Sequence, residues 1–385
     1  MKSLDFGRYA LTSCAALAIL AGCGAGSQPP INVPGASQQG AARESYDVCT
    51  GSHGNMISPW MTVRPGHKGH RALPRGLTPA NLQAAYALPS MNNGNGQIVA
   101  LIEECDNPNV ASDQAEYRSE FQLPSGQFYK FNEYGKKKNY PPARKPLGVF
   151  IDGDVEMVAA VCPNCTIYLI EANGLDQSDL QTAAKTAVSL GAHIVSNDWA
   201  CDGYGCVDKS YFDAKGVTYV GLGAVPQPGE VFPADFDTVV AVGGTYLTQG
   251  GGGKRGWTET IWKHIGGGCF TDVPKPPWQT TTGCSGRVSN DVSIVANSIL
   301  LFDSYDGLGN DGGWINVSGN NLPTALISGV FGLAGNAKKQ DGGRTFWSKK
   351  HQKHLYKVEC YGSCIYGGRF SYPDGWGTPH GIGAF

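Results

Sequence analysis

A glycine- and asparagine-rich turn that leads into an apolar segment is the part of the sequence most typical of a catalytic or anion-binding site. It runs from Ile315 to Gly335 and reads INVSGNNLPTALISGVFGLAG. A helix that begins in such a turn exposes unpaired backbone N–H groups, and its dipole favours negative charge there. The turn offers Asn320 and Asn321 but no nucleophile. With Pro323 in the first turn, we expect one of these asparagines to cap the helix by accepting a backbone hydrogen bond, contributing about 1 kcal/mol.

Carboxylates follow two of the apolar segments that read as strands. Glu103 and Glu104 end the first of these segments, and Asp198 comes directly after the segment HIVSN. A third segment is followed by the stretch Gly221–Pro226. Ligands on parallel sheets bind beyond the carboxyl ends of the strands, so we expect these residues to lie at the ligand-binding edge of a sheet.

The order of the segments predicts the architecture that positions these residues. Continuous β-rich runs alternate with amphipathic helical stretches: QIVALIE, TIYLIEA, HIVSN, VTYVGLG and TVVAVGG are separated by SDQAEYRSEFQL, DVEMVAAV and SDLQTAAKTAVSLG, among others. Such alternation predicts an α/β fold with a doubly wound, mostly parallel sheet covered by helices on both faces. A further helix is predicted from LTPANLQAAYAL, with Thr78 as its N-cap and Pro79 in its first turn.

The N-terminus has the form of a lipoprotein signal peptide, residues 1–23. Two basic residues precede the apolar run Ala10–Leu20, which is too short to cross a bilayer. The run ends in LAGC, which resembles the bacterial lipobox and makes Cys23 the expected lipid anchor. We therefore expect an exported lipoprotein of the outer membrane or cell surface, or a secreted protein if the lipobox is not used.

Three further regions follow this signal. Residues 24–45 are rich in Gly, Ser, Pro, Gln and Ala and indicate a flexible tether. Residues 46–75 indicate a short, irregular connector, and residues 76–385 form the main domain. The formal net charge of −2 argues against a nucleic-acid partner, because neutralising phosphates requires a basic face.

Eight stretches of the main domain resemble successive landmarks of the sedolisin family, serine-carboxyl peptidases with a subtilisin-like fold. In family order they are GLTPANLQAAYALPS, GDVEMVAAVCPNCTIYLIEAN, AVSLGAHIVSNDW, VVAVGGTYL, RGWTETIW, KPPWQTTTGCSGR, DVSIVA and GWGTPHGIGAF. They cover Gly76–Phe385. Each stretch alone is a weak match, but eight in order are a specific one.

The resemblance implies four catalytic positions, and three of them have changed. The family uses a Glu and an Asp four residues apart on one helix, an Asp that donates to the oxyanion, and a Ser nucleophile. Asp154 is retained, but Phe150 stands at the Glu position, Ala224 at the oxyanion Asp position and Asn321 at the Ser position. Asp152 cannot replace the Glu, because residues two apart on a helix face different sides. No catalytic set is therefore intact.

The resemblance also implies that the family's calcium site is lost. Lys357 and Ser371 stand where calcium-binding aspartates are expected, although Asp374 lies close in sequence to the second position. A lysine repels a dication, and calcium requires several oxygen ligands. We expect no metal and no cofactor.

Ten cysteines remain when Cys14 in the signal and the anchor Cys23 are set aside, an even number that permits full pairing. Twelve cysteines in all indicate an oxidising compartment. The motif CPNC has the form of a redox site, but it lies at a helix-to-strand junction like that of the family, which favours a structural disulfide. The expected pairs are Cys201–Cys206, Cys269–Cys284, Cys360–Cys364 and Cys162–Cys165, which leave Cys49 and Cys105 for each other.

Two functions follow from this reading. The first is a non-catalytic, sedolisin-like lipoprotein of the bacterial cell envelope, a monomer that binds a peptide or protein in the former substrate cleft. The second is an active secreted serine endopeptidase with a rearranged site built from Ser318 and Glu103. Ser318 lies three residues before the expected nucleophile, outside the helix start that would activate it.

Overall fold

The computed structural model describes residues 56–57, 61–65, 73–223, 229–251, 254–264, 266–280, 282–305, 312–358 and 370–385. All of them belong to one compact unit, Gly40–Phe385. The predicted lipid anchor Cys23, the oxyanion position Ala224 and three of the cysteines assigned to disulfides (Cys49, Cys360 and Cys364) lie outside the described residues. Within the described part of the chain, no helix is both long enough and apolar enough to cross a membrane.

An eight-stranded sheet forms the centre of this unit. Its strands, in spatial order, are β11 (Trp257–Ile261), β10 (Val239–Gln249), β8 (Thr218–Leu222), β6 (Ile194–Asn197), β3 (Ile98–Glu104), β5 (Thr166–Ala172) and β4 (Phe128–Asn132), and β14 (Val292–Val295) also pairs with β10. All neighbours are parallel except β10 and β11. The five predicted strand segments all lie in this sheet, so the predicted α/β class is confirmed.

Helices cover both faces of the central strands, since β6 and β8 are buried along their whole length and β3 along all but its first residue. The helices are α1 (Pro79–Ala85), α2 (Val110–Glu120), α3 (Lys145–Val161), α4 (Gln177–Ser189), α5 (Leu322–Ala334) and α6 (Lys349–Gln352), with 3-10 turns at Lys209–Phe212, Ala337–Lys339 and Gly342–Trp347. The predicted N-cap of α1 is present, because the Thr78 side chain accepts from the Asn81 N–H and the Asn81 side chain accepts from the Thr78 N–H.

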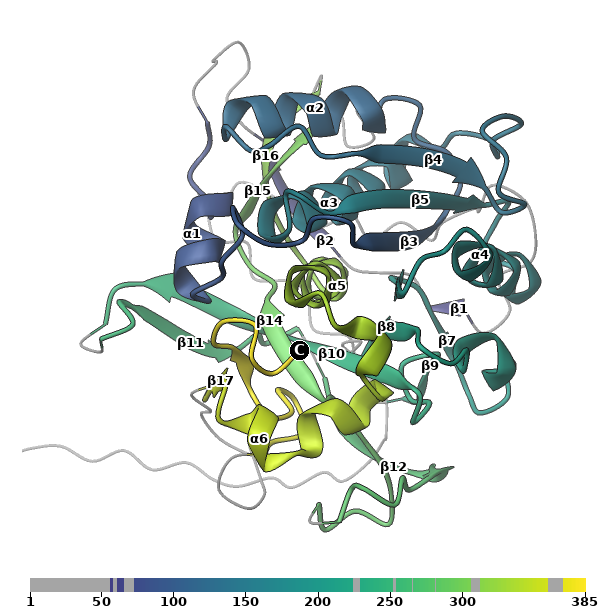
Figure 1. Cartoon of the computed structure of the whole chain (residues 1–385), viewed down its shortest axis with the longest axis vertical. Helices are drawn as coiled ribbons and strands as arrows, with labels where there is room; N and C mark the ends of the chain where they lie inside the picture. Colours follow the sequence, from purple (N-terminus) through teal and green to yellow (C-terminus); the bar gives the residue numbers. More distant parts are fainter. Residues whose placement is uncertain are drawn as a thin grey trace, which may run out of the picture. The chain divides into compact units, whose positions relative to one another are not determined.

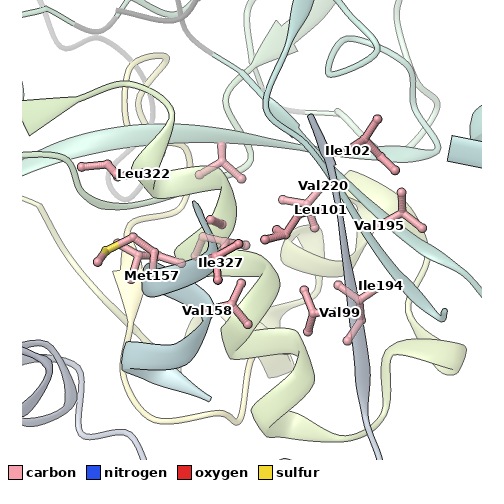
Figure 2. Packing of buried hydrophobic residues seen from close by; sticks show 14 of the residues in the cluster. Val99, Leu101, Ile102, Met157, Val158, Ile194, Val195, Val220, Leu322 and Ile327 are labelled. Carbon is pink, nitrogen blue, oxygen red and sulfur yellow. The ribbon is translucent and has the colours of Figure 1, made fainter. Parts of the chain in front are cut away.

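Helices α3 and α5 pack against each other and against β3 in the hydrophobic core (Figure 1). Figure 2 shows buried apolar side chains of this part of the core, contributed by α3, α5 and the strands β3, β6 and β8: Val99, Leu101, Ile102, Met157, Val158, Ile194, Val195, Val220, Leu322 and Ile327. This packing fixes the helix that carries Asp154 and the helix that begins at Asn321 relative to the end of β3.

Four smaller sheets surround the central one. They are β1 (Met56–Ile57) with β7 (Ala200–Asp202) and β9 (Val231–Phe232), β12 (Gly268–Pro274) with β13 (Gly286–Ser289), β15 (Ile299–Asp303) with β16 (Gly313–Gly319) and β2 (Met61–Pro65), and β17 (Leu355–Tyr356) with β18 (Thr378–Pro379). Strands β1 and β2 come from the segment read as an irregular connector. They add to sheets whose other strands lie far along the chain, which local sequence patterns do not reveal.

Three disulfides join described cysteines: Cys162–Cys165, Cys201–Cys206 and Cys269–Cys284. Each closes a loop of fewer than twenty residues. Cys105 is also disulfide-bonded. Its pairing with Cys49 stays a prediction.

Candidate functional site

Three carboxyl groups meet where the carboxyl ends of the parallel strands face helix α3. Glu103 lies near the end of β3, Asp154 in the middle of α3, and Asp198 directly after β6. One oxygen from each lies within 4.8 Å of the other two. The exposed fractions of the residues are 3%, 0% and 2%, so the cluster is almost closed to solvent. The structure therefore confirms that Glu103 and Asp198 lie together at the predicted edge.

Asn321 joins this cluster from the start of α5. Its side-chain Nδ2 donates to Asp154 Oδ1 at 3.3 Å, and the residue is fully buried. Its backbone is already helical, with φ −73° and ψ −49°, and its side chain makes no capping hydrogen bond. Of the two asparagines predicted to cap the helix, Asn321 therefore does not do so with its side chain. The Thr324 N–H bonds instead to the Asn321 backbone carbonyl, at 2.9 Å.

The cluster favours protonated carboxyls over charged ones. Burial raises the pKa of Glu103 well above its usual range, and the Asp154 carboxyl raises it further. Burial likewise raises the pKa of Asp154, and the Asp198 carboxyl raises it further. Burial also raises the pKa of Asp198, and the Glu103 carboxyl adds to that increase. The adjacent Glu104 has its pKa raised by burial to about 7. Carboxyls crowded in this way either share protons or bind a cation.

The position one helical turn before Asp154 carries Phe150, which is buried with 5% of its surface exposed. A phenyl ring accepts no proton, so the α3 face that presents Asp154 carries no second carboxylate at this position. Asp152 does not substitute for it. Its carboxyl belongs to a separate cluster with Asp113 and Asp303, as expected for residues two positions apart on a helix.

This second cluster was not predicted from the sequence. Asp113 of α2, Asp152 of α3 and Asp303 at the end of β15 each place an oxygen within 4.8 Å of the others. Asp113 accepts from the Ser304 N–H at 2.9 Å and from the Ser304 hydroxyl at 2.6 Å. The three carboxyls come from segments that are distant in sequence, so no spacing rule links them.

Ser318 lies in the strand ladder of β16. Its Oγ accepts a hydrogen bond from the Ser298 N–H at 2.8 Å. Among the described residues, no hydrogen bond joins Ser318 to Glu103 or to another carboxylate. The hydroxyl therefore lacks the adjacent base that a serine nucleophile requires.

Lys357 and Ser371, which stand where the resemblance implies calcium-binding aspartates, lie in different surroundings. Lys357 is exposed, and Ser371 forms a tight turn in which its backbone exchanges two hydrogen bonds with Gly375. Asp374 lies inside this turn with 4% of its surface exposed. Burial raises its pKa to about 8, the Glu259 carboxylate raises it further, and Lys357 lowers it. Asp374 thus behaves as a buried acid.

Comparisons with known proteins agree with this architecture, although no family profile matches the chain. Kumamolisin from Bacillus sp. (strain MN-32) is 27% identical over 241 residues, a match that covers 55% of this chain and 43% of kumamolisin. The match thus spans less than half the length of this curated relative.

Solved structures of peptidases share the fold. Pseudomonas sedolisin, a serine-carboxyl proteinase solved with two molecules of pseudo-iodotyrostatin, is similar with a TM-score of 0.66 and 20% identity, over 80% of this chain and 96% of sedolisin. The S41 psychrophilic protease is similar with a TM-score of 0.54 and 12% identity, over 77% of this chain and 96% of that protease. The chain is therefore related to the sedolisin family and has its mostly parallel, peptidase-like α/β fold.

Proposed function

We propose that this chain is a non-catalytic relative of the serine-carboxyl peptidases that binds a peptide or protein at the bacterial cell envelope. The observation that carries the proposal is the contact between Asn321 and Asp154. It places an amide at the start of α5, where the resemblance requires a serine hydroxyl.

Acyl transfer needs a nucleophile that can lose a proton to a nearby base. The amide nitrogen of Asn321 is a hydrogen-bond donor whose lone pair is delocalised, so it cannot attack a peptide carbonyl. Asp154 still faces this position, but Phe150 removes the carboxylate that would relay the proton. The fold retains the frame of the peptidase site without its reactive groups.

An active peptidase built from Ser318 and Glu103 is the second candidate. The geometry does not favour it, because the Ser318 hydroxyl is held by the Ser298 N–H in the β15–β16 region. Glu103 is instead engaged with Asp154 and Asp198.

We expect the purified full chain, kept in detergent, to show no cleavage of denatured casein between acid and neutral pH. Gel electrophoresis and release of acid-soluble peptides measure this, with heat-inactivated protein as the control. Cleavage above the control that disappears in a Ser318→Ala variant would contradict the proposal and support the rearranged site. Fluorescein-labelled casein tests binding in the same samples, and a rise in anisotropy without cleavage is the expected result.

The envelope location rests on Cys23 as a lipid anchor. We expect the wild-type protein to fractionate with membranes and to be released only by detergent, because the lipid on Cys23 inserts into the bilayer. A Cys23→Ser variant lacks the acceptor thiol, so we expect it in the soluble fraction. Fractionation followed by immunoblotting measures both. A wild-type protein found wholly in the soluble fraction would contradict the anchor and favour secretion.

A further inference from the structure

Oxygen atoms without hydrogen-bond donors are concentrated around Asp198. Both Asp198 carboxylate oxygens, one oxygen of Glu103 and one of Asp154 are buried and have no hydrogen-bond partner among the described residues. Two neutral oxygens, Asn321 Oδ1 and Thr324 Oγ1, are also buried without a hydrogen-bond partner among the described residues. Unpaired buried oxygens are costly, and so many in one place indicate that ordered water or an ion completes them.

The two neutral side chains are aimed at the carboxyl cluster. The Asn321 amide faces Asp154, and its Nδ2 donates to Asp154 Oδ1 at 3.3 Å. The Thr324 hydroxyl, in the first turn of α5, is close enough to Asp198 to favour its charged form, although the two do not reach hydrogen-bond geometry. Both residues are fully buried. Oxygens therefore approach the centre of the cluster from β3, α3, the end of β6 and the start of α5.

The spacing of the carboxyl oxygens suits a bound ion. One oxygen of each carboxyl lies within 4.8 Å of one oxygen of each of the others, and neither Asp198 oxygen has a hydrogen-bond partner among the described residues. A calcium ion with oxygen bonds of about 2.4 Å bridges oxygens at separations up to this limit. One ion can thus contact an oxygen of each of the three carboxyls.

The negative charge that the cluster carries when its carboxyls ionise has no counterpart in the described residues. None of their lysines or arginines forms an ion pair with Glu103, Asp154 or Asp198. The N-terminus of α5 contributes only about half a positive charge. Carboxyls buried in this way stay protonated unless a partner of opposite sign lets them ionise, and a divalent cation supplies that partner.

We propose that Glu103, Asp154 and Asp198 bind one calcium ion, with the Asn321 and Thr324 side-chain oxygens as neutral ligands. All the proposed ligand atoms are oxygens, whereas zinc sites in proteins are built mainly from cysteine sulfur and histidine nitrogen. Calcium therefore fits these ligands better than zinc. Magnesium prefers one or two carboxylates and several waters, whereas calcium accepts three carboxylates and irregular geometry. Rotation of the Asn321 amide by half a turn presents Oδ1 in place of Nδ2. The proposal is independent of the proposed function and differs from the sequence-based expectation of no metal, which rested on Lys357 and Ser371.

Calcium titration of the EDTA-treated full chain tests the proposal. By isothermal titration calorimetry in detergent at pH 7.5, we expect one calcium ion per chain and an accompanying rise in melting temperature. Terbium luminescence sensitised by Trp199, the residue after Asp198, gives a second readout that does not depend on activity. Magnesium is expected to bind more weakly than calcium.

Matched variants locate the ion. Asp198→Asn is expected to abolish binding, and Thr324→Val, which keeps the shape but removes the hydroxyl, to weaken it by roughly tenfold. Asp152→Asn changes a buried carboxyl on the other side of α3 and is expected to bind like the wild type. Circular dichroism confirms that each variant is folded. Absence of binding to the wild type would overturn the proposal, and so would binding that Asp152→Asn removes but Asp198→Asn leaves intact.

Discussion

Replacing Phe150 with glutamate is expected to destabilise the protein by at least about 3 kcal/mol at pH 8, even though it restores the residue type that the resemblance requires. The variant loses a buried phenyl ring and places a new carboxyl one helical turn from Asp154. That carboxyl joins a group of buried acids in which burial already raises the pKa of Asp154. Urea denaturation in calcium-free buffer, followed by circular dichroism, measures the loss.

Two comparisons separate the causes of this loss. Phe150→Leu keeps the site apolar and is expected to cost about 1 kcal/mol. The glutamate variant is expected to recover part of its stability at pH 4, where its new carboxyl is protonated, whereas the leucine variant is not. Equal stability of the two variants at pH 8 would show that the cluster tolerates another carboxyl. If the expected loss is found, restoring the glutamate at position 150 by itself costs the protein folding stability. The catalytic residues then cannot be restored one at a time without this cost.

The parts of the site that lie on the central sheet were predictable from the sequence. Glu103 and Asp198 follow strand segments whose parallel pairing brings their carboxyl ends to one edge, so their proximity required only the alternation of strands and helices. The cap of α1 was also predictable, because Thr78 and Asn81 contact each other within one turn. In both cases the signal is local or follows from a general rule of parallel sheets.

The side-chain contacts between helices were not predictable in the same way. Whether Asn321 caps α5 or reaches across to Asp154 depends on how closely α3 and α5 pack, which the sequence does not specify. The cluster of Asp113, Asp152 and Asp303 depends on three elements that meet only in the folded protein. Helix α3 consequently carries buried acids on two sides, and only one side had been assigned a role.

The buried Asp374, in the tight turn that begins at Ser371, is expected to make the stability of the protein strongly dependent on pH. Burial raises the pKa of Asp374 to about 8 in the folded protein, while an exposed aspartate in the unfolded chain has a pKa of about 3.9. A raised folded pKa means that the stability contributed by the neutral carboxyl is fully present below about pH 4 and is lost as the pH rises towards about 8. Asp374 therefore lowers stability at pH 8 on the order of a few kcal/mol.

An Asp374→Asn variant keeps the shape of the neutral carboxyl and removes its titration. We expect it to be more stable than the wild type at pH 8, by several degrees in melting temperature, and nearly equal to it at pH 4. Differential scanning calorimetry at both pH values measures the difference. Asp272→Asn, the same change at an exposed position on β12, serves as the control and is expected to change little. If Asp374→Asn instead lowers the melting temperature at pH 8, the carboxylate is charged in the folded protein, and the turn then holds a cation that the asparagine cannot bind.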